Sequence, residues 1–386
     1  MQTVHGRHVV ATTLLALAGI IWPAAAPAYD GMTLPPSGDN QRASVSQWIG
    51  PVEVNITYNS PKVTSPTGED RHGKIWGGLV PYGYANLGFG SCGDKCPWRG
   101  GANENTVFRT SNAVKIDGQP LAAGSYGLHF IPGKDEWTIV FSKNSTAWGS
   151  FFYDQNEDAL RVTVKPIAHP YLHWLTYEFV ERAPDHASVQ LAWEDLAVPF
   201  KITVDDINEV YLAAIRQELK NSPGFQNTSW VAAAQFCLQN KINLAEGLTW
   251  AAQAVNSRFF GQSNFTNLML LADLQDANGK TAEAVKSHQQ ALDDPAATPQ
   301  EIHGYARQLQ GMGKKDDAIK IFMFNAKRFP NRWPVHVGMM RAYSAQGKFA
   351  DAIKEANLAI AQAPDEANKK NVQGQMEKLK QGKDIN

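Results

Sequence analysis

The sequence lacks the features that mark several large classes of protein. Six or more basic residues never occur in a row, and the formal net charge is −1 over 386 residues. Because nucleic-acid binding depends on clustered positive charge, we expect no nucleic-acid partner. The patterns G-x-S-x-G and H-E-x-x-H, typical of serine hydrolases and zinc peptidases, do not occur. No motif assigns a catalytic residue, so the catalytic residues stay unknown, and we expect no cofactor.

Cysteine is also scarce, with only Cys92, Cys96 and Cys237 present. The first two lie four positions apart in a loop rich in glycine, and we expect them to form a disulfide. Zinc normally takes four ligands and only two thiols are local, so we expect no metal site. A bound metal and free thiols are the alternatives for this pair. Cys237 lies in an apolar helical context and is expected to be a buried thiol.

The N-terminus has the pattern of a targeting segment. Arg7 precedes an apolar run over residues 9–22, and Ala26-Pro27-Ala28 provides an A-x-A cleavage site. We expect residues 1–28 to be a signal peptide, residues 29–42 a flexible leader, and the protein to be exported to the periplasm or secreted. No later apolar stretch approaches membrane-spanning length, so we expect no transmembrane segment after cleavage.

Hydrophobic residues alternate with polar ones from about residue 43 to residue 205. This period of two is typical of strands, and turn residues separate the runs. No helical period lies between the strands, which argues against a parallel α/β arrangement. We therefore expect an all-β sandwich or barrel domain over residues 43–205. The runs begin near Val52, Tyr126, Trp137, Val162, Trp174, Val189 and Phe200.

Residues 206–386 carry a helical period and an internal repeat. Gly-Lys pairs begin at Gly279, Gly313 and Gly347, each 34 residues after the last. A 34-residue period is typical of tetratricopeptide-like helical hairpins that stack into a solenoid. The glycine suits the turn between the two helices of a unit. We expect this α-helical repeat domain to bind a protein or peptide partner.

One stretch of the β domain concentrates residues suited to ligand binding. Residues 74–83 and 98–106 hold glycines, aromatics, amides and an arginine without strand periodicity. One hypothesis is a ligand pocket in which an arginine fork, amide hydrogen bonds and aromatic stacking act together. Its expected members are Arg99, Asn103, Glu104, Asn105, Trp76, Tyr82 and Trp98. The alternative is a structural plug in which Arg99 pairs with Glu104 and the aromatics close one end of the sandwich.

Residues 40–204 resemble the bacterial domain-of-unknown-function family 2911. The likeness rests on residues 73–83, 98–99 and 101–106, on Gly124, and on Trp148-Gly149, Tyr153, Asp158 and Arg161. The resemblance implies an exported protein and brings no established activity. Two features depart from the family pattern: residues 84–97, with both loop cysteines, are inserted, and Asn59 stands where arginine is expected.

These features together favour a binding protein over an enzyme. The solenoid would hold a protein or peptide, and the β domain would bind a small ligand or stabilise a surface. The alternative is a cell-envelope enzyme of the saccharide-directed hydrolase type. Its acid-base residues would be Glu104, His129 or Asp158.

Overall fold

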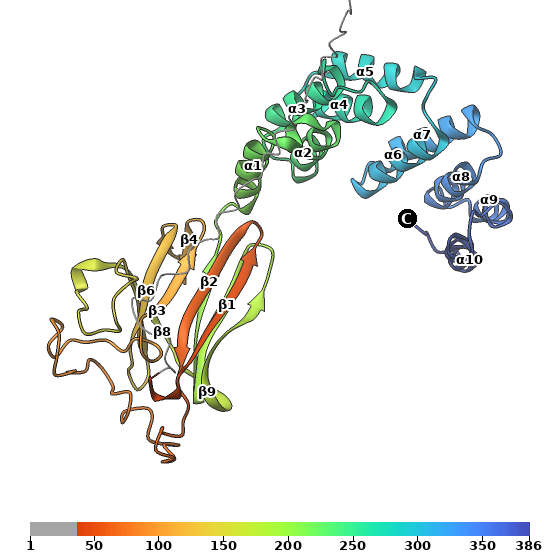
Figure 1. The fold of residues 1–386 in the computed structure, drawn as a ribbon. Coiled ribbons are helices and arrows are strands. Elements are labelled where there is room, and N and C mark those ends of the chain that lie inside the picture. The colour runs from red at the N-terminus through yellow and green to blue at the C-terminus, as the bar shows by residue number, and fades with distance from the viewer. Residues whose placement is uncertain (1–36) are drawn as a thin grey trace, which may run out of the picture.

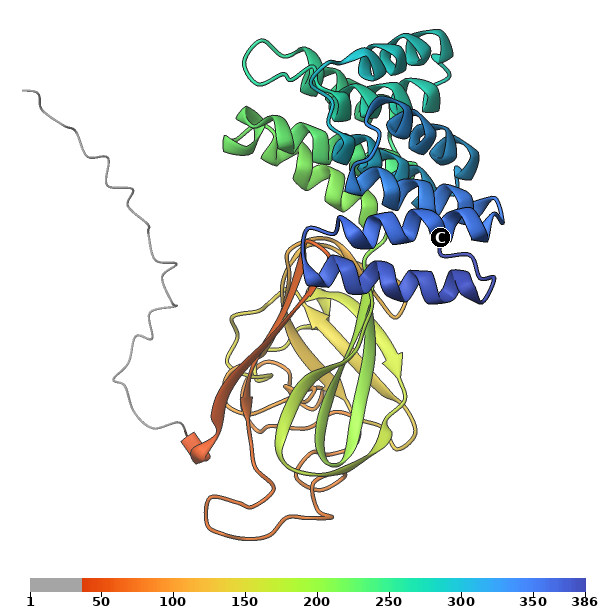
Figure 2. The same ribbon diagram turned by 90° about the vertical axis from the view of Figure 1, so that its right-hand side faces the viewer.

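The structure, a computed structural model, describes residues 37–386. The expected signal peptide and most of the expected leader therefore lie outside the described residues. Figures 1 and 2 show a β domain with the helical domain at one end. In the described part of the chain, no helix combines the length and the apolar character needed to cross a membrane.

The β domain contains two antiparallel sheets, so the sandwich alternative is confirmed. The six-stranded sheet has the order β1-β2-β3-β6-β7-β8, and the four-stranded sheet has the order β5-β4-β10-β9. The strands of the described residues are β1 (Gln41–Ile49), β2 (Val52–Ser60), β3 (Thr106–Thr110), β4 (Val114–Ile116), β5 (Gln119–Leu121), β6 (Gly124–Ile131), β7 (Trp137–Ser142), β8 (Asp158–Val164), β9 (Ile167–Arg182) and β10 (His186–Thr203).

The alternation seen in the sequence corresponds to side chains that point in turn toward the core and toward the surface. Val52, Val54 and Ile56 of β2 are fully buried, and the residues between them are half-exposed. Rings from both sheets meet in the middle, where Phe108 lies 5.1 Å from Phe141 and 6.4 Å from Phe200 between centroids. Edge-to-face and tilted ring pairs of this kind stabilise a core beyond the area they bury.

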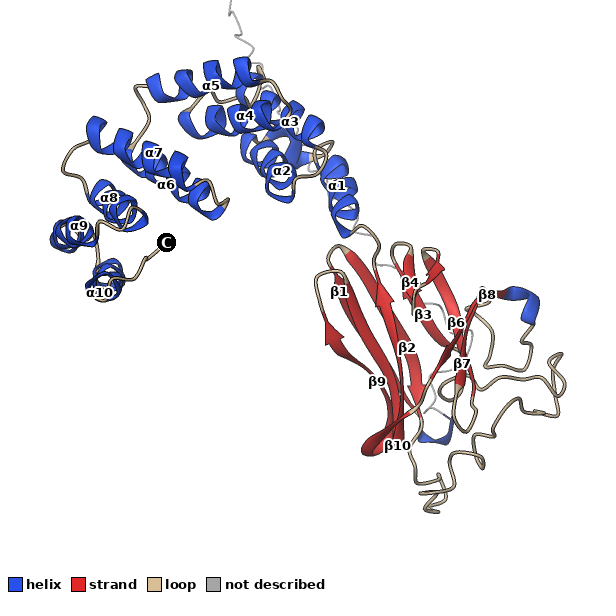
Figure 3. Cartoon of the chain, turned by 180° about the vertical axis from the view of Figure 1, so that it is seen from behind, coloured by secondary structure: helices blue, strands red, loops and turns tan. Residues whose placement is uncertain are grey.

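A long segment without regular strands, residues 61–105, joins β2 to β3. Figure 3 shows the loops at the end of the sandwich that is opposite the helices. Trp98 joins this segment to the sheet, because its backbone exchanges two hydrogen bonds with Phe130 of β6, at 2.8 and 2.7 Å. Ordered loops of this length inside a compact domain are uncommon and usually have a functional role.

The helical domain has ten α-helices within the described residues. They are α1 (Ile207–Glu218), α2 (Asn227–Asn240), α3 (Leu244–Asn256), α4 (Phe265–Ala277), α5 (Thr281–Asp293), α6 (Pro299–Gly311), α7 (Lys315–Arg328), α8 (Trp333–Ala345), α9 (Phe349–Ala361) and α10 (Glu366–Lys380). Short 3-10 turns lie at Ser37–Asp39, Gln155–Glu157 and Ser222–Phe225.

The 34-residue repeat corresponds to the hairpins α4–α5, α6–α7 and α8–α9. Gly279, Gly313 and Gly347 occupy the three turns with φ values of 75°, 78° and 71°. Side chains rarely adopt this left-handed region, so the spacing of the glycines follows from the spacing of the turns. The expected helical repeat architecture is confirmed.

A tightly packed position follows each of these turns. Ala284, Ala318 and Ala352 are almost completely buried. Gly247 lies at the corresponding place in the hairpin α2–α3, where a Cβ atom would come within 2.6 Å of Cys237 Cβ. The earlier hairpin therefore leaves no room for a side chain at this position.

The two domains are joined directly, since β10 ends at Thr203 and α1 begins at Ile207. Ile207 and Val210 of α1 pack against the core of the sandwich. The turn between β1 and β2 approaches the same helix, because a Cβ atom at Gly50 would lie 2.7 Å from Ile207 Cδ1. The first helix of the solenoid is thus partly covered by the β domain.

Candidate functional site

The expected pocket residues of the β domain divide into two groups. A cavity of about 390 Å³ at the loop end is lined by Trp98, Arg99 and Asn103 of the expected set. Trp76, Tyr82, Glu104 and Asn105 are not among the residues that line it. The cavity also takes in residues that the sequence did not single out, among them Asn40, Lys62, Arg71, Leu79 and Trp193.

Trp76 is part of an aromatic cluster and does not offer a stacking face to this cavity. Its ring lies 5.8 Å from Trp98, 5.2 Å from Trp137 and 5.8 Å from Trp193. Its indole nitrogen is buried and has no hydrogen-bond partner within residues 37–386. Trp137 and Trp193 are each only 1% exposed. For Trp76, the structure therefore favours the plug interpretation, whereas Trp98 serves both the cluster and the cavity.

Three cationic side chains reach the cavity. Arg71 is held in place because its Nε and Nη2 donate to the backbone oxygens of Val63 and Lys62, both at 2.9 Å. Lys62 Nζ lies 3.5 Å from a carboxylate oxygen of Asp39. Arg99 is the third cation, and burial lowers the pKa of its guanidinium. Cationic side chains beside the tryptophans that line this cavity could bind an anionic group of a ligand.

Arg99 is fixed by its neighbours. Its Nη1 donates to the backbone oxygen of Asn103, and its guanidinium lies 5.1 Å from the centre of the Phe151 ring. Asn103 itself has a φ of 56°, a conformation that asparagine tolerates better than most residues. Its side-chain oxygen accepts a hydrogen bond from Asn40 at 3.2 Å. The local turn therefore holds the cation in one orientation.

The pairing of Arg99 with Glu104, expected in the plug interpretation, is not what the structure contains. Glu104 instead accepts a hydrogen bond from Asn59 Nδ2 at 2.7 Å. Asn59 is the position where the family pattern led us to expect arginine, so an amide takes the place of a cation beside this carboxylate. Asn105 is 5% exposed, and its side-chain oxygen is buried with no hydrogen-bond partner in the part of the chain that the structure describes.

A second polar group lies between β6, β8 and the loop that precedes β8. His129 Nδ1 lies 2.9 Å from Ser150 Oγ, and both residues are at most 2% exposed. Tyr153 donates to both carboxylate oxygens of Asp158, at 3.0 and 2.8 Å. Arg161 Nε donates to the same carboxylate at 2.6 Å. Burial, and then the charge of Arg99, lowers the pKa of His129 to about 4.

This geometry bears on the enzyme alternative. Glu104 is hydrogen-bonded to Asn59, His129 is almost completely enclosed, and Asp158 is tied to Tyr153 and Arg161. None of the three acid-base candidates is among the residues that line the cavity. A general acid or base must come within hydrogen-bond reach of its substrate. The three candidates therefore do not meet at this cavity.

The inserted loop is closed by a disulfide between Cys92 and Cys96, whose Cα atoms are 5.1 Å apart. The backbones of Cys96 and Ala85 exchange two hydrogen bonds, at 2.9 and 3.1 Å. The bridge packs with Val140 and Tyr153 in a small apolar cluster. The insertion is thereby attached to β7 and to the polar group around Asp158. Cys237 is a free thiol and is buried.

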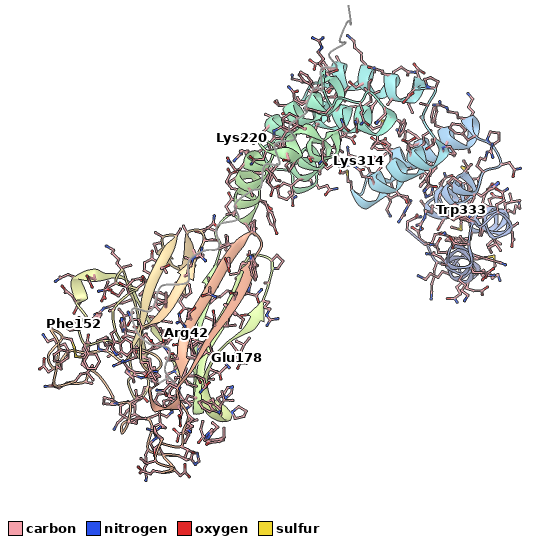
Figure 4. The ribbon with its side chains drawn as sticks, in the orientation of Figure 1. Arg42, Phe152, Glu178, Lys220, Lys314 and Trp333 are labelled. Atoms are coloured by element: carbon pink, nitrogen blue, oxygen red, sulfur yellow. A yellow bond between two sulfur atoms is a disulfide. The ribbon has the colours of Figure 1, made fainter. Side chains whose placement is uncertain are left out.

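The solenoid has two adjoining cavities on the side formed by the first helices of its hairpins. The smaller, of about 190 Å³, lies over α2, α4 and α6 and is lined by Gln235, Thr266, Leu270, Glu301, Gly304, Tyr305 and Gln308. The larger, of about 800 Å³, continues past the ends of the same helices. Gln308 belongs to both, and Lys314, labelled in Figure 4, lines the larger one.

Tyr305 is one of the residues that line the smaller cavity, and its hydroxyl has a fixed partner. Its hydroxyl donates to Asp273 Oδ1 at 3.0 Å, and Asp273 is 5% exposed. Burial, together with the Asp273 carboxylate, raises the pKa of this tyrosine well above its usual range. Gly304 lies beside it, where a Cβ atom would meet nothing within 4 Å. The cavity floor is thus ordered, and the space above Gly304 is open.

Comparison with known proteins gives a family match for the β domain. Residues 40–202 match the family described as "Protein of unknown function (DUF2911)". No curated protein is significantly similar to the chain. The helical part is similar to solved structures of repeat proteins, at low sequence identity.

Three of these solved structures are compared by sequence identity, by the share of each chain that is covered, and by TM-score. The crystal structure of MamA is 13% identical, covers 40% of this chain and 88% of its own, and has a TM-score of 0.26. A tetratricopeptide repeat protein from Parabacteroides merdae ATCC 43184 is 16% identical, covers 46% and 68%, and has a TM-score of 0.26. YrrB, described as a TPR protein with an unusual peptide-binding site, is 12% identical, covers 44% and 87%, and has a TM-score of 0.24.

Proposed function

We propose that this chain is an exported binding protein whose solenoid holds an extended segment of a partner protein. Export is supported by Arg7, the apolar run over residues 9–22 and the A-x-A site that ends at Ala28. A disulfide between Cys92 and Cys96 is in keeping with an oxidising compartment.

The observation that carries this proposal is the pair of adjoining cavities along α2, α4 and α6. Gln308 lines both of them, so one ligand could occupy the two together. Amide and hydroxyl side chains line the smaller cavity, and they can pair with the backbone of an extended peptide. Apolar side chains such as Leu238, Leu244 and Met312 line the larger one and would accept an aliphatic side chain. Concave solenoid surfaces are suited to such extended ligands.

Two matched glycines test this proposal. Gly304 lines the smaller cavity, whereas Gly374 lies on α10, and a Cβ atom at either position would meet nothing within 4 Å. Arginine is about 1 kcal/mol more favourable than glycine inside a helix, so Gly304→Arg and Gly374→Arg should both fold. Only Gly304→Arg places a long side chain in the cavity.

In the experiment, the full chain is the bait for selecting peptides from a display library. The affinity of the selected peptides is then measured by fluorescence anisotropy. We expect Gly304→Arg to weaken binding at least about tenfold, which corresponds to about 1.4 kcal/mol. Gly374→Arg should bind like the original chain. Equal binding by both variants, with circular dichroism showing both folded, would place the peptide elsewhere and overturn the proposal.

A second candidate function concerns the β domain. Lys62, Arg71 and Arg99 line a cavity of about 390 Å³ beside Trp98, which favours a small ligand with a carboxylate or phosphate group. Because Trp98 lines the cavity, tryptophan fluorescence can follow titration with phosphate esters and small dicarboxylates. Lys62→Met should weaken any binding seen, whereas Lys165→Met, at an exposed position outside the cavity, should not. Unchanged binding by Lys62→Met would contradict this assignment.

A further inference from the structure

The segment that follows α10 returns to the solenoid and lies against α8 and α6. Gly382 has a φ of 67°, and the amide of Lys383 donates to the carbonyl of Lys378 at 3.0 Å, so the chain reverses direction there. Figure 1 marks this end of the chain inside the curve formed by α6, α8 and α10. We call residues 383–386 the return segment.

The return segment makes the contacts that an extended peptide ligand would make. Asp384 Oδ1 accepts from Ser344 Oγ at 2.7 Å, and the amide of Ile385 donates to the same Ser344 Oγ at 3.1 Å. The carbonyl of Ile385 accepts from Arg341 Nη1 at 3.3 Å. The Ile385 side chain packs against the apolar cluster of α8, α9 and α10. A carboxylate, a backbone carbonyl and an aliphatic side chain are therefore each recognised separately.

The last residue extends these contacts to the neighbouring hairpin. Asn386 Nδ2 donates to the carbonyl of Arg341 at 3.1 Å, and Asn386 Oδ1 accepts from Gln310 Nε2 at 2.7 Å. Gln310 belongs to α6, the helix whose Gln308 lines both cavities of the proposed peptide site. The return segment and the proposed peptide site therefore both use side chains of α6, two positions apart.

The site beneath the return segment carries positive charge that is incompletely balanced. Arg341 is 9% exposed, its Nε is buried without a partner, and no ion pair joins it to a carboxylate among the described residues. Burial, and then repulsion by Arg307, lowers the pKa of Arg341 to about 10, while Asp384 acts in the opposite direction. A buried cation without a counter-ion is unfavourable, so a carboxylate would be bound well here.

We infer that the face formed by α6 and α8 is a subsite for an extended peptide that carries an acidic residue followed by an aliphatic one. The return segment occupies this subsite from within the same chain and competes with the partner. This inference rests on the proposed function, because it extends the same peptide site along the solenoid. Asp384 and Ile385 show the order of the two recognised side chains.

The test compares the full chain with a variant in which the return segment no longer fits. Asp384→Asn together with Ile385→Gly removes the carboxylate and the aliphatic anchor while keeping the chain length. The probe is a fluorescein-labelled peptide with the sequence of residues 381–386. A segment tethered to the same chain has an effective concentration of about 1 mM. If the free peptide has a dissociation constant of about 0.1 mM, competition by the return segment weakens its apparent affinity about tenfold.

We expect the double variant to bind this peptide about tenfold more tightly than the unchanged chain in fluorescence anisotropy. A control peptide with asparagine in place of the aspartate should bind the double variant much more weakly, and this control does not alter the protein. Equal affinity of the two chains, equal affinity of the two peptides, or no binding at all would each overturn the inference. Peptides selected by display that remain sensitive to Gly304→Arg would show that the proposed function stands even then.

Discussion

The enclosed His129 predicts that the β domain loses stability in mild acid. In the unfolded chain a histidine has a pKa of about 6.5, whereas burial and Arg99 lower the folded value to about 4. Between these two values the unfolded chain binds a proton that the folded domain does not. The free energy of unfolding therefore falls as the pH falls through this window, and the stability is fully present above it.

The size of the effect follows from the two pKa values. Proton linkage gives a loss of about 2 kcal/mol from this one side chain when the pH is lowered from about 7 to about 5. The loss approaches about 3 kcal/mol near pH 4, where the folded histidine begins to be protonated. Because small domains are stable by only about 5–15 kcal/mol, such a change is readily measured.

The assay is urea unfolding at several pH values, followed by tryptophan fluorescence, to which the β domain contributes more tryptophans than the helical domain. His129→Gln keeps a side chain able to bond Ser150 and removes the titrating group. We expect this variant to lose about 2 kcal/mol less than the unchanged chain between about pH 7 and about pH 5. When unfolding is followed instead by circular dichroism at 222 nm, a signal that the helices dominate, the two proteins should show the same pH dependence. An identical pH dependence of the β domain in the two proteins would refute the reasoning.

Two further predictions concern packing and the disulfide. Gly247→Ala should destabilise the helical domain by about 1–3 kcal/mol in thermal unfolding, because the added Cβ atom meets Cys237 Cβ at 2.6 Å; a Cys237→Gly background, which lacks that Cβ atom, should relieve part of this cost, and equal effects of Gly247→Ala in both backgrounds would contradict the reasoning. Replacing Cys92 and Cys96 by serine should lower the stability of the β domain by at most about 2 kcal/mol, since the loop they close is short. A loss well above that value in urea unfolding would show that the bridge also holds the polar group around Asp158.

The sequence was sufficient to predict the features that depend on local spacing. The repeat predicted the three hairpin turns, because a left-handed turn at Gly279, Gly313 and Gly347 requires the same residue each time. Alternation predicted the strands, because buried and exposed positions such as Val52 and Glu53 must alternate on a half-buried sheet. Neither prediction depends on contacts between residues that are far apart in the chain.

The candidate sites depend on contacts between residues far apart in the chain, which spacing does not reveal. Lys62 and Arg71 reach the cavity of the β domain from a part of the loop that carries no motif. Trp76 belonged to the motif and was expected to stack on a ligand, but its closest aromatic neighbours include Trp137 and Trp193 from two different sheets. Composition shows which side chains a segment offers, whereas the opposing sheet decides which of them remain accessible.

The direct junction between β10 and α1 has a mechanical consequence. A partner that pulls on the solenoid transmits the load through Ile207 to the end of β10, a strand that lies between β4 and β9. Its hydrogen bonds to β9 run across the strand, so tension along the strand shears many of them at once. The sandwich therefore resists tension that reaches it through α1 along β10.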